Sequence, residues 1–184
     1  MVTKATAVQF GCGPVGCSVV RYAWQRPDIE LVGAVDIDKS LVGHDLGEIA
    51  GINKLGVNIS ADADAVLSQA KPDVAFLTTS SSLKVIYPLV EKCVAAGVNV
   101  VTTCEELCYP YRKDPQLSAE VDKIAKVNNV TVLATGVNPG FIMDAWALFM
   151  TGVCQQVKRV SSQSSGCLST SWSFPEEDRG RVHT

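Results

Sequence analysis

The chain has 184 residues, of which 47% are apolar and 19% are charged, and its formal net charge is −3. This length suits one sizeable domain, and the slightly acidic balance offers no basic surface for a polyphosphate backbone, so nucleic acid is not an expected partner. No apolar run reaches the roughly 18 residues of a membrane span and the N-terminus does not resemble a signal peptide, so we expect a cytoplasmic protein without membrane contact.

Short apolar runs rich in β-branched residues alternate with longer helical patterns along the chain. The sequence predicts strands at 6–10, 29–37, 72–80, 98–103 and 130–136, and helices at 15–26, 62–70, 83–97, 114–129 and 140–157. Residues 38–60 are rich in glycine and irregular, and are predicted to form a surface excursion. Nearly continuous apolar strands separated by helices are typical of a parallel sheet covered on both faces. The expected fold class is therefore α/β, a Rossmann-type doubly wound parallel sheet.

Three glycines follow the first predicted strand and open the first predicted helix. In such a GxGxxG turn the first glycine allows a tight turn, the second lets the backbone approach a pyrophosphate, and the third lets the helix pack close to the sheet. Free N–H groups and the dipole at the helix start favour the anion. An ordinary glycine turn is the alternative. The residues assigned to cofactor binding here are Gly11, Cys12, Gly13, Pro14, Val15 and Gly16.

The second predicted strand ends in an acidic residue, Asp36, which lies 20 positions after Gly16. A carboxylate at this place can accept both ribose hydroxyls of an adenosine and would repel a 2′-phosphate. The expected cofactor is therefore NAD or NADP, with NAD favoured, while Lys39 and Ser40 leave NADP open.

Two further segments lie at the carboxyl ends of predicted strands, at the edge of the sheet where ligands of such folds lie. The small hydroxyl residues Thr78, Thr79 and Ser80 offer space and donors beside a dinucleotide. The phrase "GVNPGF" is predicted to form a turn in which Asn138 and Pro139 bracket a nicotinamide, with a plain turn as the alternative.

Two carboxylates, Glu105 and Glu106, follow the strand predicted at 98–103. One of them could hold or deprotonate an ammonium group in a partly desolvated cleft, and acid in the first turn of a helix is the alternative. The seven cysteines contain no CxxC pair, and Cys104 and Cys108 have no histidine nearby, so no metal site is expected. His44 and His183 are given no role.

The phrases "FGCGPVG", "VGAVDID", "VGHDLGEIAG", "DVAFLTTSSS", "NVVTTCEELCYP" and "GVNPGFIMD" together resemble the family of 2,4-diaminopentanoate dehydrogenase and native amine dehydrogenases. That family shares the amino-terminal domain type of dihydrodipicolinate reductase. The resemblance implies oxidative deamination of a small amine or amino acid by NAD(P), giving a ketone and ammonia, in a homodimer when full length. It also implies that a glutamate of "CEEL", Glu105 or Glu106, orients the amine or activates water. The alternatives are a dihydrodipicolinate reductase-like imine reductase, against which "TTCEEL" argues, and a non-catalytic nucleotide-binding module.

The resemblance implies two unequal parts in this chain. Residues 1–160 are expected to form the NAD(P)-binding Rossmann domain, whereas residues 161–184 are a serine-rich tail unlike the family. Family members continue for about as long again with a substrate domain, which is missing here. We interpret the tail as the product of a shifted reading frame, with a native disordered tail as the alternative. Little or no turnover is therefore expected from this truncated chain alone.

Overall fold

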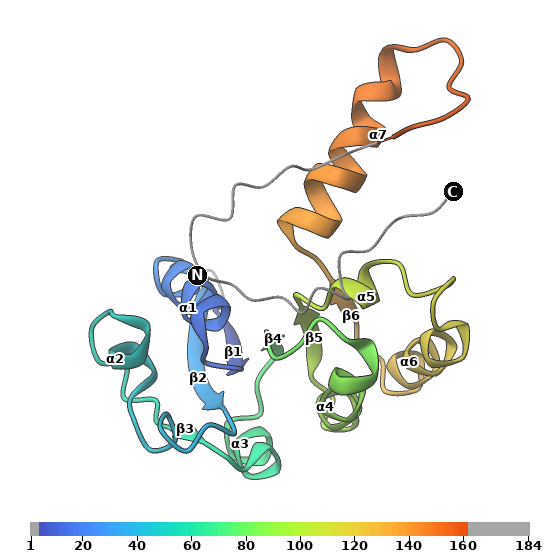
Figure 1. Cartoon of the computed structure of the whole chain (residues 1–184). Coiled ribbons are helices and arrows are strands. Elements are labelled where there is room, and N and C mark those ends of the chain that lie inside the picture. Colours follow the sequence, from blue (N-terminus) through green and yellow to red (C-terminus); the bar gives the residue numbers. More distant parts are fainter. Residues whose placement is uncertain (1–3, 162–184) are drawn as a thin grey trace.

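The computed structural model describes residues 4–161. Six parallel strands form one sheet in the order β3-β2-β1-β4-β5-β6 (Figure 1). They are β1 (Ala5–Phe10), β2 (Ile29–Val35), β3 (Ile59–Ser60), β4 (Val74–Leu77), β5 (Asn99–Thr102) and β6 (Val132–Ala134). Because β1 pairs with β2 on one side and with β4 on the other, the strand order reverses beside β1. This order confirms the expected doubly wound Rossmann-type sheet.

The strands are connected by helices, which end in a longer helical segment that stands away from the sheet (Figure 1). They are α1 (Pro14–Trp24), α2 (Leu46–Ala50), α3 (Ala63–Ala70), α4 (Leu83–Ala95), α5 (Glu105–Cys108), α6 (Pro115–Val127), the π-helix η1 (Val137–Trp146), α7 (Ala147–Met150) and the short 3₁₀ turn η2 (Thr151–Val153). None of the helices between residues 4 and 161 is long and apolar enough to cross a lipid bilayer.

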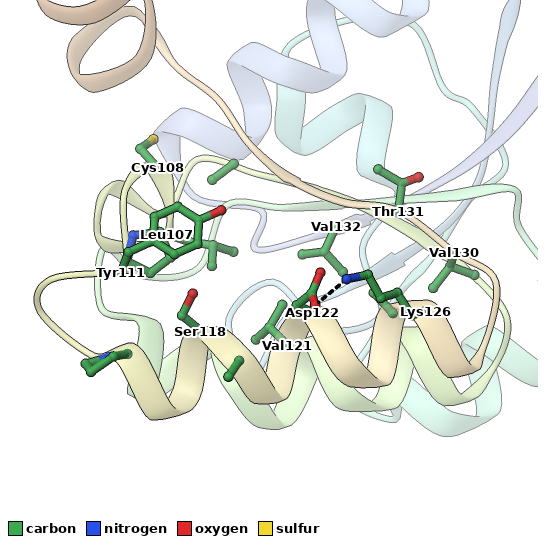
Figure 2. Close-up of a pocket in the computed structure, with 15 residues that line it drawn as sticks. Leu107, Cys108, Tyr111, Ser118, Val121, Asp122, Lys126, Val130, Thr131 and Val132 are labelled. Atoms are coloured by element: carbon green, nitrogen blue, oxygen red, sulfur yellow. Dashed lines mark hydrogen bonds and ion pairs between the residues drawn. The ribbon is translucent and has the colours of Figure 1, made fainter.

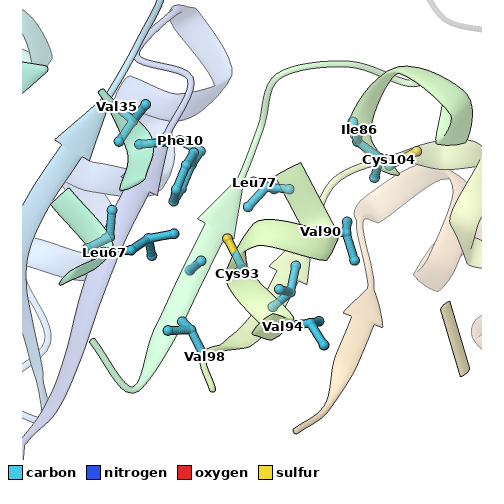
Figure 3. Packing of buried hydrophobic residues seen from close by; sticks show 14 of the residues in the cluster. Phe10, Val35, Leu67, Leu77, Ile86, Val90, Cys93, Val94, Val98 and Cys104 are labelled. Carbon is cyan, nitrogen blue, oxygen red and sulfur yellow. The ribbon is translucent and has the colours of Figure 1, made fainter. Parts of the chain in front are cut away.

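Two hydrophobic cores lie on opposite faces of the sheet. Under α3, α4 and α6, the side chains of Phe10, Leu77 and Ile86 belong to one buried cluster (Figure 3). Under α1 and α2, a smaller cluster contains Val20 and Leu46. Full burial of each such side chain stabilises the fold by about 1.5–3 kcal/mol. The sheet is thus held from both faces, and its strand ends are kept in fixed positions.

Several helix boundaries follow from local sequence signals. Asp62 and Asp114 precede α3 and α6, and their side chains accept hydrogen bonds from N–H groups in the first turn. Such caps satisfy amides that have no acceptor within the helix. After α4 the chain turns at Gly97, whose φ of 75° is readily adopted by glycine alone.

The prediction of an irregular surface excursion at 38–60 was wrong in part. This segment contains α2 and the edge strand β3, and it buries Leu46, Ala50 and Ile59 against α1 and β2. A helix of five residues and a strand of two are too short to show a periodic pattern, and their apolar residues pack on distant parts of the chain.

A single buried carboxylate, that of Asp45, organises this segment. Its Oδ1 accepts hydrogen bonds from the N–H groups of Gly47, Glu48 and Leu55 at 2.8, 3.3 and 3.0 Å, and its Oδ2 accepts one from Gly56 at 2.8 Å. Burial alone would raise the pKa of Asp45, but the four backbone donors outweigh it and hold the pKa below its ordinary value. Asp45 therefore both caps α2 and ties the loop after it to the start of the helix.

The turn predicted at "GVNPGF" was also wrong, because residues 137–140 already lie in η1. The expected helix at 140–157 begins three residues earlier and its helical turns end at Val153. Proline is tolerated in the first turn of a helix, where N–H groups have no acceptor within the helix, so Pro139 does not prevent the helix from starting. The predicted tail, residues 161–184, falls almost wholly outside the described residues.

Candidate functional site

The site lies where the strand order reverses, at the carboxyl ends of β1 and β4. The glycine loop, which we define as residues 11–16, joins β1 to α1 at this point. In open α/β sheets a ligand occupies the crevice outside these strand ends. The structure therefore brings the predicted glycine motif to the place where it can act.

Protein contacts explain two of the three glycines of the loop. Gly11 has a φ of 82°, and a Cβ on it would lie 2.9 Å from the carbonyl oxygen of Thr78. A Cβ on Gly16 would lie only 1.8 Å from the carbonyl oxygen of Gly11. Both positions therefore need glycine so that the loop, α1 and β4 can pack closely.

No contact within the described chain explains Gly13. Its φ is −71°, which any residue adopts, and a Cβ on it would meet no atom within 4 Å. The space above Gly13 is therefore open, and it lies at the first turn of α1, where Val15 and Gly16 have N–H groups without an acceptor in the helix. An anionic group that approaches the backbone closely fits this space, as a pyrophosphate does.

The side chains of Cys12 and Pro14 contribute shape to the loop. Cys12 is buried, and its thiol donates to the carbonyl of Val35 at 3.9 Å. Burial raises the pKa of Cys12 to about 12, so its thiol stays protonated at neutral pH. Pro14 stands at the first position of α1 and has no N–H to donate. The loop thus offers a ligand its backbone groups and not these side chains.

Asp36 lies beside the glycine loop, as the sequence predicted. Its Oδ2 accepts the N–H of Cys12 at 2.6 Å and its Oδ1 accepts the N–H of Asp38 at 2.9 Å. Each carboxylate oxygen has a further lone pair, so the held carboxylate can still accept hydrogen bonds from a ligand. The structure therefore joins the acid at the end of β2 to the loop after β1.

The three hydroxyl residues after β4 differ in their surroundings. Thr78 uses its Oγ1 within the protein, donating to the carbonyls of Phe10 and Gly11 at 3.0 Å each. Ser80 accepts the N–H of Ser82 through its Oγ at 3.1 Å, whereas Thr79 is exposed. Thr78 therefore shapes the glycine loop, and Thr79 is the hydroxyl that remains accessible.

Sequence reasoning missed Gln9, which is fully buried under the glycine loop. Its Nε2 donates to the carbonyl of Gly11 and to Oγ1 of Thr78, both at 2.8 Å, and to the carbonyl of Phe10 at 3.1 Å. Its Oε1 has no hydrogen-bond partner among the described residues. An amide side chain between the apolar residues Val8 and Phe10 was the available signal. Gln9 holds the end of β1 in the shape that the loop requires.

The two adjacent glutamates have different environments. Glu106 is half-buried: its Oε2 accepts the N–H of Leu83 at 2.8 Å and the hydroxyl of Ser82 at 3.2 Å, and its Oε1 lies 2.6 Å from Nζ of Lys113. Burial would raise the pKa of Glu106, but Lys113 and the donors at the start of α4 outweigh it and lower the pKa. Glu105 is exposed and has no hydrogen bond or ion pair in the described chain. Glu106 thus braces α4, whereas the carboxylate of Glu105 forms no hydrogen bond or ion pair with another described residue.

Asn138 and Pro139 lie in η1, which follows β6. β6 is separated from β1 by β4 and β5 in the sheet, so two strands lie between the start of η1 and the end of β1. Between residues 4 and 161, no three His, Cys, Asp or Glu side chains lie close enough together to form a metal site.

A cavity of about 490 Å³ lies between α6 and β6, away from the glycine loop. Figure 2 shows that apolar and polar side chains both line it, with Val121 of α6 facing Val132 of β6. The charged residues Asp122 and Lys126 on its rim pair with each other at 2.7 Å. Because its lining has no unpaired charge and no glycine-loop residue, we do not assign the cofactor to this cavity.

More than half of the chain matches one known protein family. The family described as "Dihydrodipicolinate reductase, N-terminus" matches residues 7–106, which include the glycine loop, Asp36 and both glutamates. The chain belongs to this family. The resemblance to amine dehydrogenases with a reductase-type amino-terminal domain is thereby confirmed.

Relatives of this reductase-type domain include dehydrogenases and reductases. The chain is 31% identical over 179 residues to 2,4-diaminopentanoate dehydrogenase of Acetoanaerobium sticklandii, covering 96% of this chain and 50% of that protein. It is 37% identical over 100 residues to 4-hydroxy-tetrahydrodipicolinate reductase of Synechocystis, covering 51% of this chain and 35% of that protein. The structure of an amine dehydrogenase from Mycobacterium smegmatis matches with a TM-score of 0.76 and 35% identity, covering 82% of this chain and 44% of that chain. The chain thus spans about half the length of these dehydrogenases.

Within this reductase-type domain, Glu106→Gln is expected to lower the free energy of unfolding by about 1–2 kcal/mol, because it removes a charged acceptor from Lys113 and from the start of α4. Thermal denaturation at neutral pH measures the change. Since the pKa of Glu106 is lowered in the folded state, its contribution is present above the ordinary glutamate pKa. That contribution is lost as the pH falls through the lowered value, so the difference from the wild type should shrink there.

The matched control for this prediction is Glu105→Gln, which removes the same charge one residue earlier. It should change stability by less than about 0.5 kcal/mol, because the carboxylate of Glu105 is exposed and makes no bond in the described chain. Equal losses in the two variants would contradict the bracing role of Glu106.

Proposed function

We propose that this chain is the cofactor-binding part of an NAD-dependent oxidoreductase that deaminates a small amine or amino acid to a ketone and ammonia. The observation that carries the proposal is the open space over Gly13, bordered by the free amides of α1 and by the carboxylate of Asp36. A pyrophosphate fits the first of these features and an adenosine ribose fits the second. The amine as substrate is supported by the likeness to 2,4-diaminopentanoate dehydrogenase and amine dehydrogenases.

NAD is favoured over NADP by the charges at the end of β2. Asp36 is fixed by its bonds to the N–H groups of Cys12 and Asp38, so it cannot swing away from a ribose without losing both. Asp38 adds a second carboxylate, which is turned toward the N–H and hydroxyl of Ser40. A 2′-phosphate would meet this negative charge, whereas two ribose hydroxyls would find acceptors.

The chemistry proposed for the site combines a hydride acceptor with a carboxylate. The bound nicotinamide would supply the acceptor for a hydride from the carbon that carries the amine. Glu105 is the carboxylate that we assign to the amine, because it is exposed at the start of α5, just after β5, and its carboxylate has no bond within the described chain. Held there, it would bind the ammonium, take up its proton, and direct a water molecule to the resulting imine carbon. Glu106 would keep α5 and the start of α4 in place.

A second candidate is an imine reductase, because several relatives are 4-hydroxy-tetrahydrodipicolinate reductases. That reaction would use the same cofactor crevice, but the hydride would pass from the reduced cofactor to the imine carbon. A binding module without chemistry would also use the crevice. Because the 184 residues alone should turn over little, substrate-dependent changes in cofactor absorbance distinguish the three in a protein of the relatives' full length: the first needs an amine, the second an imine, and the third shows none.

Three further expectations belong to this proposal. Because the longer dehydrogenases extend to about twice this length, the 184 residues alone should bind cofactor but turn over little. A homodimer is the assembly that we propose for the full-length form. The cytoplasm is the compartment that we propose, since the expected cofactor and substrates are metabolites found there.

Calorimetry with NAD tests the cofactor site. Asp36→Asn is expected to weaken NAD binding by about 10–100-fold, because a charge-assisted hydrogen bond contributes about 1.5–3 kcal/mol. The same variant should lower the ratio of NAD affinity to NADP affinity. Asp38→Asn is the matched control and should change NAD affinity by less than about threefold. A wild-type chain that binds neither dinucleotide would refute the proposal.

A further inference from the structure

The amide of Gln9 is fully buried and lies directly under the glycine loop. Its Nε2 is within 3.1 Å of three acceptors, which are the carbonyl oxygens of Phe10 and Gly11 and the hydroxyl of Thr78. These acceptors fix which end of the amide carries the hydrogens, because the reversed amide would set Oε1 against two carbonyl oxygens. The amide therefore directs both of its hydrogens at the underside of the loop.

The hydrogens under the loop match the acceptors there. The amide of Gln9 supplies two hydrogens and the hydroxyl of Thr78 supplies one. Gln9 donates to the carbonyl of Gly11 and to the hydroxyl of Thr78, both at 2.8 Å. Thr78 in turn donates to the carbonyl of Phe10 at 3.0 Å. Three hydrogens thus serve three acceptors, and the two side chains act as one network.

The other end of the same amide is not satisfied. Oε1 of Gln9 is buried and has no hydrogen-bond partner among the described residues. An unpaired buried amide oxygen destabilises a fold, and an apolar side chain of similar length would avoid that penalty. Stability alone therefore does not explain a glutamine at this position. What remains to explain it is the effect of its two hydrogens on the loop.

The peptide group that follows Gly11 is held at both ends. Its carbonyl oxygen points inward to Gly16 and receives hydrogens from Gln9 and Thr78. Its N–H donates to Oδ2 of Asp36 at 2.6 Å. The C=O and N–H of a trans peptide point in opposite directions, so a rotation of this peptide would break the bonds at both ends. It would also turn the carbonyl oxygen toward the carboxylate of Asp36.

An anion at the first turn of a helix is stabilised by amide hydrogens and opposed by nearby carbonyl oxygens. In the glycine loop the carbonyl oxygens of Phe10 and Gly11 are turned inward and covered by donors. Without those donors, their partial negative charge would lie uncompensated beneath the start of α1. The loop would also be free to turn an oxygen outward, to the place where a diphosphate needs amides.

We propose that Gln9 is a positioning residue for the diphosphate of the dinucleotide, and that it acts through the carbonyl of Gly11 without touching the ligand. The inference rests on the cofactor proposed above and adds a residue to that site. It predicts that ligands with a diphosphate depend on Gln9. Adenosine should not depend on it, because Asp36 keeps its bond from the N–H of Asp38 and so remains in place for the ribose.

Calorimetry of the 184-residue chain with NAD and with ADP tests the inference. Gln9→Met keeps a side chain of similar length and removes both hydrogens, so it should raise the dissociation constants of NAD and ADP by about tenfold or more. The dissociation constant of adenosine, followed by NMR titration, should change by less than about threefold. The melting temperature should fall by less than about 5 °C, because the lost donors are offset by removal of the unpaired Oε1.

Thr78→Val removes the third hydrogen of the network and should cause the same selective loss, so the test does not depend on one variant. The double variant should weaken NAD binding by less than the product of the two single effects, since both act on the carbonyl of Gly11. Thr102→Val is the matched control. Thr102 is also buried, but its hydroxyl donates to the carbonyl of Leu77, outside the loop. It should change NAD affinity by less than about threefold.

The outcomes separate this inference from the cofactor proposal. A wild type that binds neither NAD nor ADP would refute both. A wild type that binds them, with unchanged affinity in a folded Gln9→Met variant, would overturn the role of Gln9 and leave the cofactor proposal standing. If Gln9→Met does not fold, unchanged affinity in Thr78→Val has the same meaning. Equal losses of affinity for adenosine and for ADP would also overturn it, because they would show that Gln9 only maintains the fold.

Discussion

Gly16→Ala should lower the free energy of unfolding by about 3 kcal/mol or more and abolish NAD binding. The new Cβ would lie 1.8 Å from the carbonyl oxygen of Gly11 and 2.9 Å from Oγ1 of Thr78. Neither of these oxygen atoms stands at the end of a long, flexible side chain, so α1 must move away from the glycine loop. Thermal denaturation measures the first effect and calorimetry measures the second.

Gly13→Ala is the matched control for the loss of stability, because it should weaken NAD binding without destabilising the fold. The new Cβ meets no protein atom within 4 Å and a φ of −71° suits alanine, so stability should stay within about 0.5 kcal/mol of the wild type. NAD affinity should fall by about tenfold or more, because the methyl group would occupy the space that the pyrophosphate needs. Unchanged affinity in this variant would place the pyrophosphate elsewhere.

Asp45→Asn is expected to destabilise the domain by about 3 kcal/mol. The amide keeps one oxygen, but its NH₂ group would face the N–H of Gly56 or the three N–H groups now held by Oδ1. At roughly 2–4 °C per kcal/mol for a chain of this size, the melting temperature should fall by about 10 °C. Asp122→Asn, which removes an exposed i,i+4 ion pair with Lys126, should change it by less than about 2 °C.

The effect of Asp45 should also depend on pH. Its pKa is lowered in the folded state, so its ionised form stabilises the fold above the ordinary aspartate pKa. This stabilisation is lost as the pH falls through the lowered value. The gap in melting temperature between the wild type and Asp45→Asn should therefore be widest near neutrality and should narrow in acid. If this difference in melting temperature does not change with pH, the charge of Asp45 contributes nothing to stability.

Local signals were sufficient to predict most of the fold. The glycine spacing after an apolar strand identified the β1–loop–α1 unit, and Asp36 followed at the expected distance. Helices such as α4 and α6 are long enough to show their period and to carry recognisable ends, including Gly97. These features depend on neighbours in the chain, so a single sequence contains them.

The features that were missed depend on distant contacts. The two residues of β3 form a strand because they pair with the end of β2, and Asp45 is buried because its carboxylate meets Leu55 and Gly56 across a loop. Glu105 and Glu106 are chemically identical neighbours, and only the position of Lys113 and of the start of α4 distinguishes them. No pattern along the chain encodes these placements.

The central position of β1 has a consequence for synthesis on the ribosome. β1 needs β4 as well as β2, and the bond from Thr6 to Asp73 at this junction spans 67 residues. At about 5–20 residues per second, β1 would wait several seconds with one apolar edge unpaired before β4 emerges. A nascent chain in this interval would be a substrate for ribosome-associated chaperones. Slowing translation before residue 73 should increase aggregation, because the edge of β1 would stay unpaired for longer.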